Sequence, residues 1–185
     1  AIGAGIALMV DMNCPMDGAA AIAFAHACRE AAPLFLEEPV WPPEDFATLA
    51  EVRVKGGLDI AAGENACTVH QFRQMLTAGA VSHAQPSVIK VGGITEYLKV
   101  VALADAMGVK LAPHSPYFGP GLLTTLQLMS LRDDGTFVEI FYMNRAACLW
   151  GGRIDVDAKG TIAVPDGPGL GYEPDRDVMA RYRVQ

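Results

Sequence analysis

The stretch IALMVD at residues 6–11 is followed by two runs of the same form, LFLEE at 34–38 and LDIAAGE at 58–64. Each run is short, apolar and rich in branched residues, and each leads to an acidic residue. Three further runs continue the series: HAQPS at 83–87, KLAPH at 110–114 and FVE at 137–139. The polar residues that mark the six runs are 26, 27, 23, 27 and 25 residues apart. This spacing predicts a repeated unit of strand, loop, helix and return.

The segments between these runs carry helix signals. Asp17 can cap a helix through AAAIAFAHACRE, and Thr68 can cap VHQFRQMLTA, with Gly79 just after its end. Gly93 precedes a further helical segment, ITEYLKVVALADAM, which stops at Gly108. Because the strands are continuously apolar rather than alternating, the pattern favours a parallel sheet covered on both faces.

Six strands are readable, and a segment rich in Gly, Pro and Asp follows from about residue 150. We therefore predict an α/β fold in which residues 1–149 form a partial (β/α) barrel and residues 150–185 form a C-terminal tail containing a short hairpin and loops. A closed barrel needs eight strands and roughly 250 residues, so 185 residues are too few. Either the first strands are missing, or the chain is an open doubly wound sheet. An incomplete barrel exposes strand edges, so we expect assembly with the missing segment or with other copies, as a homo-oligomer.

Composition excludes several classes of partner. The chain is 51% hydrophobic with a formal net charge of -7, as in a soluble globular protein. It has no basic stripe, which argues against nucleic acid and anionic membranes as partners. No apolar run approaches the roughly 20 residues of a membrane span. The four cysteines form no C-x-x-C pair, and we expect free thiols in a reducing cytoplasm. These are Cys14, Cys28, Cys67 and Cys148.

Three carboxylates stand at the ends of consecutive predicted strands, Asp11, Glu37 and Glu64. In a parallel barrel the carboxyl ends of all strands meet at one face, so these side chains are expected to converge. A single acidic residue at such a place is more simply a helix cap or a surface charge. Three of them repel one another unless a cation neutralises them. Oxygen ligands without Cys or His favour Mg²⁺, or Mn²⁺, over zinc.

Six short motifs then occur in order along the chain. They are VDMN at 10–13, LEEP at 36–39, GEN at 63–65, IKVGG at 89–93, APH at 112–114 and VE at 138–139. Together they resemble the mandelate racemase branch of the enolase superfamily, in the mandelate racemase/muconate lactonizing enzyme family. The resemblance runs from the third strand of that family's TIM-type barrel to its C-terminal tail.

The resemblance implies an enzyme and assigns roles to several residues. The metal ligands of the family fall on Asp11, Glu37 and Glu64. In the family, Mg²⁺ binds a substrate carboxylate, a base removes the neighbouring α-proton, and the metal stabilises the enediolate that forms. Asn13 is then expected beside the substrate. Glu139 matches the family acid that hydrogen-bonds the substrate carboxylate, whereas Glu38 is not expected to be a ligand.

The family's proton-transfer histidine falls on His114. Many members pair this residue with an Asp, and the corresponding position here is Ser87. A hydroxyl can orient an imidazole but cannot raise its pKa as a carboxylate does. We therefore expect His114 to act as an acid that expels a leaving hydroxyl. Ser87 and Lys90 are assigned to the surroundings of the substrate.

The resemblance makes a sugar-acid dehydratase the first functional hypothesis, with an acid sugar as the small carboxylate substrate. A racemase or epimerase of a 2-hydroxy acid is the second hypothesis, because it uses the same first step. A catalytically inactive metal-binding homologue is the third, because Ser87 interrupts the His–Asp pair. The family's second base and its N-terminal capping domain are expected before Ala1.

Overall fold

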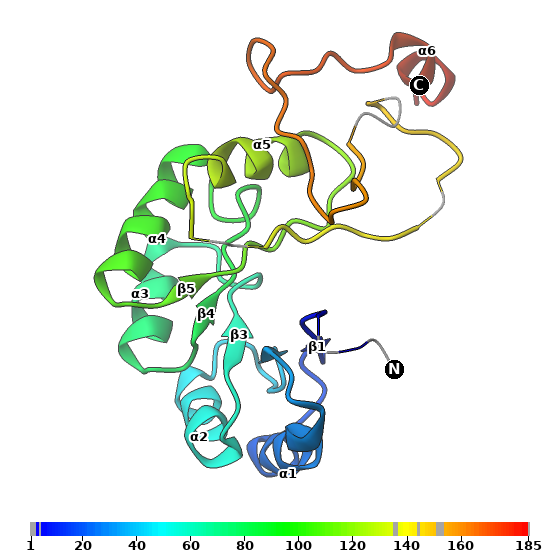
Figure 1. The fold of residues 1–185 in the computed structure, drawn as a ribbon. Coiled ribbons are helices and arrows are strands. Elements are labelled where there is room, and N and C mark those ends of the chain that lie inside the picture. The colour runs from blue at the N-terminus through cyan, green and yellow to red at the C-terminus, as the bar shows by residue number, and fades with distance from the viewer. Residues whose placement is uncertain (1–2, 4, 135–136, 144, 151–153, 185) are drawn as a thin grey trace. The chain divides into compact units, whose positions relative to one another are not determined.

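The structure is a computed structural model that describes residues 3, 5–134, 137–143, 145–150 and 154–184. The chain divides into two compact units, Ala1–His114 and Ser115–Gln185 (Figure 1). The sequence-based boundary between residues 149 and 150 stays a prediction. Among the described residues, no helix has both the length and the apolar character needed to cross a membrane.

The first unit contains a five-stranded parallel sheet with its strands in chain order. The strands are β1 (Met9–Asp11), β2 (Phe35–Glu37), β3 (Ile60–Ala62), β4 (His83–Ala84) and β5 (Lys110–Leu111). The helices are α1 (Gly18–Cys28), the 3-10 turn η1 (Arg29–Ala31), α2 (Phe46–Gly56), α3 (Val69–Thr77) and α4 (Ile94–Ala106). Each of the first four strands is followed by a helix before the next parallel strand begins. This confirms the predicted βα repeat.

The strand order separates the two predicted architectures. A doubly wound sheet reverses its strand order at a switch point, whereas β1 to β5 pair consecutively without a reversal. In Figure 1 the helices α1 to α4 follow one another along one side of this sheet. Consecutive parallel strands with helices on the outside are the arrangement of a partial (β/α) barrel.

Apolar packing on both faces of the sheet holds the strands in place. Leu36 and Ile60 are fully buried, as are Val52, Phe72 and Val100 of the helices. On the other face, residues from three strands or strand ends form a cluster with Met9 and Leu34 packed against it: Phe35, Ala61 and Ala112. Successive strand residues point to opposite faces, so the residues that alternate with the helix-packed ones face the barrel interior.

The predicted helix caps are confirmed. The Asp17 carboxylate accepts a hydrogen bond from the Ala20 amide at 2.9 Å, and the Thr68 hydroxyl accepts one from the Gln71 amide at 3.2 Å. Each side chain satisfies a backbone donor that the first helical turn leaves free. Gly93 is the N-terminal flanking residue of α4, as expected.

The second unit contains α5 (Pro120–Met129) and α6 (Arg176–Arg181). An antiparallel bridge between Val156 and Ile162 confirms the short hairpin expected in the tail. The sixth predicted strand was wrong, because residues 137–139 form no strand. Both backbone groups of Glu139 are taken by one side chain. The Ser115 hydroxyl donates to the Glu139 carbonyl at 2.8 Å and accepts from its amide at 3.1 Å.

Candidate metal centre

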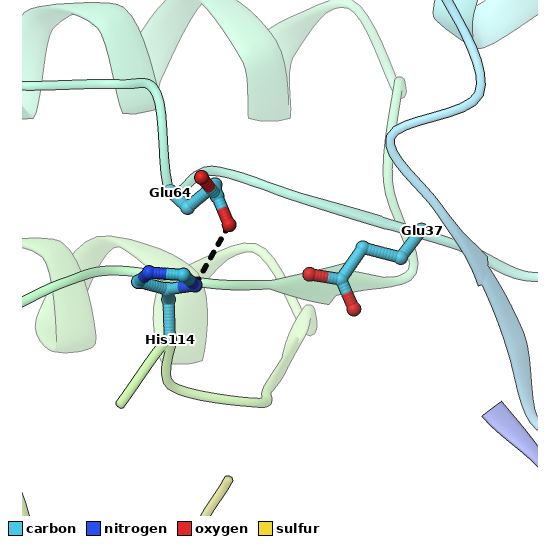
Figure 2. A group of neighbouring side chains, drawn as sticks. All are labelled: Glu37, Glu64 and His114. Carbon is cyan, nitrogen blue, oxygen red and sulfur yellow. Dashed lines mark ion pairs between the residues drawn. The ribbon is translucent and has the colours of Figure 1, made fainter. Parts of the chain in front are cut away.

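Three side chains at the carboxyl end of the sheet come together in the first unit. One oxygen of Glu37, one oxygen of Glu64 and one ring nitrogen of His114 all lie within 4.8 Å of one another (Figure 2). Glu37 is the last residue of β2, Glu64 lies two residues beyond β3, and His114 lies three residues beyond β5. Parallel strands bring their carboxyl ends to one edge, which is why residues far apart in sequence meet here.

Glu64 contacts two nitrogen-bearing side chains, those of His114 and Lys90. Its Oε2 lies 2.8 Å from Nδ1 of His114, and its Oε1 lies 3.2 Å from Nζ of Lys90. The hydrogen bond with His114 is the main cause that lowers the pKa of Glu64, against an opposing effect of burial. The charges of His114 and Lys90 add to this lowering of the pKa. Glu64 is therefore held as a carboxylate.

Asp11 lies beside this group without belonging to it. β1 and β2 pair in register so that Asp11 stands opposite Glu37. The Asp11 carboxylate, however, accepts two hydrogen bonds from Asn13, one from the backbone amide at 2.9 Å and one from Nδ2 at 2.6 Å. Of the predicted triad, the structure brings Glu37 and Glu64 together with His114 and places Asp11 on the neighbouring strand.

The donor set fits a hard divalent cation. Two carboxylates within 4.8 Å of one another repel each other unless positive charge lies between or beside them. Oxygen donors with at most one imidazole suit Mg²⁺ or Mn²⁺ better than a thiolate-binding metal. The predicted ligand Asp11 adds a third carboxylate on the adjacent strand.

A second set of contacts lies directly beside the metal group, centred on Glu38. Both oxygens of this carboxylate accept hydrogen bonds from Nδ2 of Asn65, at 3.0 and 2.8 Å. The thiol of Cys14 donates to Glu38 Oε2 at 3.3 Å, and the Cys14 amide donates to the Glu38 carbonyl at 2.7 Å. We call Cys14, Glu38 and Asn65 the Glu38 network.

Burial shifts the pKa of two members of this network. Glu38 is only 5% exposed, and this burial raises its pKa, although the hydrogen bond from Asn65 partly opposes the rise. Burial together with the neighbouring Glu38 charge raises the pKa of Cys14 to about 12. Sequence reasoning missed Cys14 and Asn65 as site residues. The only available signal was that Asn65 directly follows Glu64 in the GEN motif.

The remaining predicted residues, Ser87 and Glu139, lie in different units. Ser87 is fully buried beyond β4, and its hydroxyl accepts a hydrogen bond from the Lys90 amide at 3.3 Å. This contact belongs to the turn that carries Lys90 toward Glu64. Glu139 lies in the second unit, where its carboxylate accepts a hydrogen bond from the Ser115 amide at 3.3 Å.

The chain matches one known protein family over most of its length. A family model described as "Enolase C-terminal domain-like" matches residues 1–178. The D-galactarolactone cycloisomerase of Agrobacterium fabrum is 31% identical over 100% of this chain and 51% of its own length. The D-galactonate dehydratase of Ralstonia pickettii is 38% identical over 80% of this chain and 40% of its own length. The chain thus spans about half the length of these relatives, or less.

Solved structures agree with this comparison. The 3,6-anhydro-D-galactonate cycloisomerase of Zobellia galactanivorans superposes with a TM-score of 0.90 at 27% identity, over 100% of this chain and 52% of that one. The L-talarate dehydratase of Polaromonas sp. JS666, solved with Mg and L-glucarate, gives a TM-score of 0.84 at 27% identity. It covers 99% of this chain and 49% of its own. Both likenesses confirm that the sheet is part of a barrel.

Proposed function

The chain belongs to the mandelate racemase/muconate lactonizing enzyme family of the enolase superfamily, and on this premise we propose that it carries the metal half of a sugar-acid dehydratase. The observation that carries the proposal is the meeting of Glu37, Glu64 and His114 at the carboxyl end of the sheet. Such a site would act on a small carboxylate by removing the proton on the neighbouring carbon and eliminating a hydroxyl group.

The proposed roles follow from the contacts of each side chain. Asp11, Glu37 and Glu64 would hold Mg²⁺, with Mn²⁺ as a possible substitute. When bound, the ion supplies positive charge that lowers the pKa of the α-proton and stabilises the resulting enediolate. Lys90 lies 3.2 Å from Glu64 and adds positive charge at the rim.

His114 is the proposed proton-transfer residue. Its Nδ1 lies 2.8 Å from a Glu64 oxygen, and this contact fixes the orientation of the ring. Nε2 is the ring nitrogen that we propose gives a proton to a leaving hydroxyl, which departs as water. Hydrogen bonds that orient one ring nitrogen and so define the role of the other are common in histidine catalysis.

The remaining predicted residues are proposed to bind substrate. Asn13 lies on the turn after β1 next to Asp11, and Ser87 lies on the turn that carries Lys90. Glu139 would contact the substrate carboxylate. The sheet edges β1 and β5 support assembly with further chain or with other copies, and size-exclusion chromatography of the full-length protein tests the proposed homo-oligomer.

The substrate class is an acid sugar. The relatives named D-galactonate dehydratase and the dehydratase structure that contains L-glucarate support this choice. The test is a screen of acid sugars with the full-length protein and Mg²⁺, with semicarbazide detection of a 2-keto-3-deoxy acid. Exchange of the α-proton with D₂O without keto-acid formation would contradict a dehydratase.

An isomerase is the second candidate. It is favoured by two cycloisomerases, one 31% identical over 100% of this chain and one with a TM-score of 0.90. An isomerase would rearrange a lactone or invert a stereocentre without losing water. Mass spectrometry of the products of the same screen separates the two, because only the dehydratase product is lighter than its substrate by the mass of one water molecule.

A further inference from the structure

We propose that Glu38, held by Asn65 and Cys14, is a positioning residue that fixes the separation of the metal-binding carboxylates. The inference rests on the proposed function, because it assumes that Asp11, Glu37 and Glu64 bind the metal. It adds a physical reason for the spacing of the ligands, which the sheet alone does not provide.

The Glu38 network joins three consecutive βα units at the positions of the ligands. Glu38 directly follows Glu37, and Asn65 directly follows Glu64. The hydrogen bonds from Asn65 to Glu38 therefore tie the residue after one ligand to the residue after the next. Cys14 stands three residues after Asp11 and ties the third loop to the same carboxylate.

The sheet does not hold Glu64 by itself. Pairing of β3 with β4 ends at Ala62, two residues before Glu64. The backbone then turns, with the Ala66 amide donating to the Gly63 carbonyl at 3.0 Å. Asn65, which lies within this turn, reaches back to the β2 side through Glu38. The contact between Asn65 and Glu38 is thus a side-chain link between the turn that carries Glu64 and the strand that carries Glu37.

Burial and backbone geometry indicate that the link is firmly held. Glu38 has a φ of 39° and Cys14 a φ of 55°, a region that non-glycine residues adopt only when their surroundings enforce it. Glu38 is buried with both carboxylate oxygens hydrogen-bonded. It does not belong to the Glu37–Glu64–His114 group, and together with Asn65 it lines a separate cavity of about 130 Å³. A buried, fully paired carboxylate that does not reach the metal group is suited to hold its neighbours in place.

The first test measures Mg²⁺ binding by isothermal titration calorimetry on the full-length protein. Asn65→Leu keeps the approximate volume of the side chain and removes both hydrogen bonds to Glu38. We expect the dissociation constant for Mg²⁺ to rise about tenfold or more, in the range found when residues that orient metal ligands are removed. Glu44→Gln is the matched control, because Glu44 lines the same cavity. It removes a charge there without a change in the network, so its Mg²⁺ affinity should stay at the wild-type value.

The second test uses Cys14, where a milder change is available. Cys14→Ala removes the thiol donor, and Cys14→Ser restores a hydroxyl donor of similar size. We expect Mg²⁺ affinity to fall severalfold in the alanine variant and to recover in the serine variant. A purely structural role would lower the melting temperature in EDTA without this pattern of Mg²⁺ affinity. The Cys14 pair also keeps the inference testable if Asn65→Leu does not fold.

The outcomes separate this inference from the proposed function. Failure of the wild-type protein to bind Mg²⁺ overturns both. Wild-type affinity in Asn65→Leu, or in Cys14→Ala where Asn65→Leu does not fold, overturns the positioning role and leaves the proposed function standing. A double variant, Asn65→Leu with Cys14→Ala, should lose less affinity than the two single losses predict together, because both donors act through one carboxylate. Full additivity would show that they do not.

Discussion

Two neighbouring pairs of residues lie on the same two loops and have opposite surroundings. Glu37 and Glu64 meet with His114 at the end of the sheet. The residues that follow them, Glu38 and Asn65, face each other in a closed hydrogen-bonded contact. The first pair brings like charges together, whereas the second matches a carboxylate with an amide donor.

The difference shows how one strand end can serve two purposes. The chain leaves extended geometry after each of these glutamates, since Glu38 has a φ of 39° and Asn65 lies in a turn. One position can therefore face the metal group while the next contacts the neighbouring loop. A pair of carboxylates that lie close together is suited to bind a cation. A carboxylate that is already satisfied is suited to hold the loops. Substitutions in the two pairs can test this difference in role.

We call Glu37 and Glu64 the open pair, and we call Glu38 and Asn65 the closed pair. The largest expected effect is at the open pair. Glu64→Gln keeps the shape of the side chain and removes a predicted ligand charge. We expect Mg²⁺ binding to be lost in calorimetry and kcat/KM to fall about 1,000-fold, the scale seen when a group that stabilises developing charge is removed. Glu51→Gln, on an exposed helical residue paired with Lys55, is the charge-matched control. Unchanged Mg²⁺ affinity in Glu64→Gln would remove the main distinction between the two pairs.

Substitution of His114 tests whether this residue binds the metal together with the open pair or transfers protons. Its Nδ1 contacts Glu64 at 2.8 Å, which is compatible with either proton transfer or metal ligation. If His114 transfers protons, His114→Asn should lower kcat about 100-fold and raise the Mg²⁺ dissociation constant about tenfold, the scale for loss of a contact that orients a metal ligand. His26→Asn, on the exposed side of α1, is the control. A loss of Mg²⁺ affinity as large as that of Glu64→Gln would instead make His114 a ligand.

Much of this arrangement could be predicted from the sequence, because it depends on local patterns. Apolar runs at a regular spacing predicted the parallel strands, and their polar ends predicted that Glu37 and Glu64 would meet. The caps at Asp17 and Thr68 follow from the side chains themselves. Each of these features needs only residues that are close in sequence, together with the common direction of parallel strands.

Other features depend on contacts that the pattern does not encode. The expected strand at 137–139 is absent because the hydroxyl of Ser115, 24 residues away, takes both backbone groups of Glu139. The Glu38 network requires positive φ angles at Cys14 and Glu38, and neither residue type predicts that geometry. Cys14 therefore looked like an ordinary free thiol until its partner was known.

The alkylation rates of Cys14 and Cys67 test whether Cys14 is held against Glu38 in the folded protein. Burial raises the pKa of Cys14 to about 12, so its thiolate fraction at pH 8 is about one in ten thousand. Cys67 is exposed. Iodoacetamide at pH 8, followed by peptide mass spectrometry, should modify Cys67 at least about 100-fold faster than Cys14. The difference should disappear in urea. Equal rates in the folded protein would mean that Cys14 is not enclosed with Glu38.

The smallest expected effect is on the stability of the metal-free protein, to which Glu64 and Glu38 contribute with opposite pH dependences. The pKa of Glu64 is lowered below its ordinary value of 4.5, chiefly by His114. Glu64 therefore adds stability above about pH 4.5 that is lost as the pH falls through its folded-state pKa. The pKa of Glu38 is raised by burial. Its contribution to stability is therefore greatest at acid pH and declines as the pH rises from about 4.5 through the raised value.

Melting temperatures in EDTA between pH 4 and pH 7 can separate these contributions. Relative to wild type, Glu64→Gln should lose stability as the pH rises, and Glu38→Gln should gain it, each by about 2–4 °C for roughly 1 kcal/mol. Each Gln variant retains the size of its side chain and no longer titrates. Because the two residues lie on adjacent strand ends, a general change in net charge would move both curves the same way. Shifts of the same sign in both variants would therefore contradict the division between an open, charged pair and a closed, satisfied one.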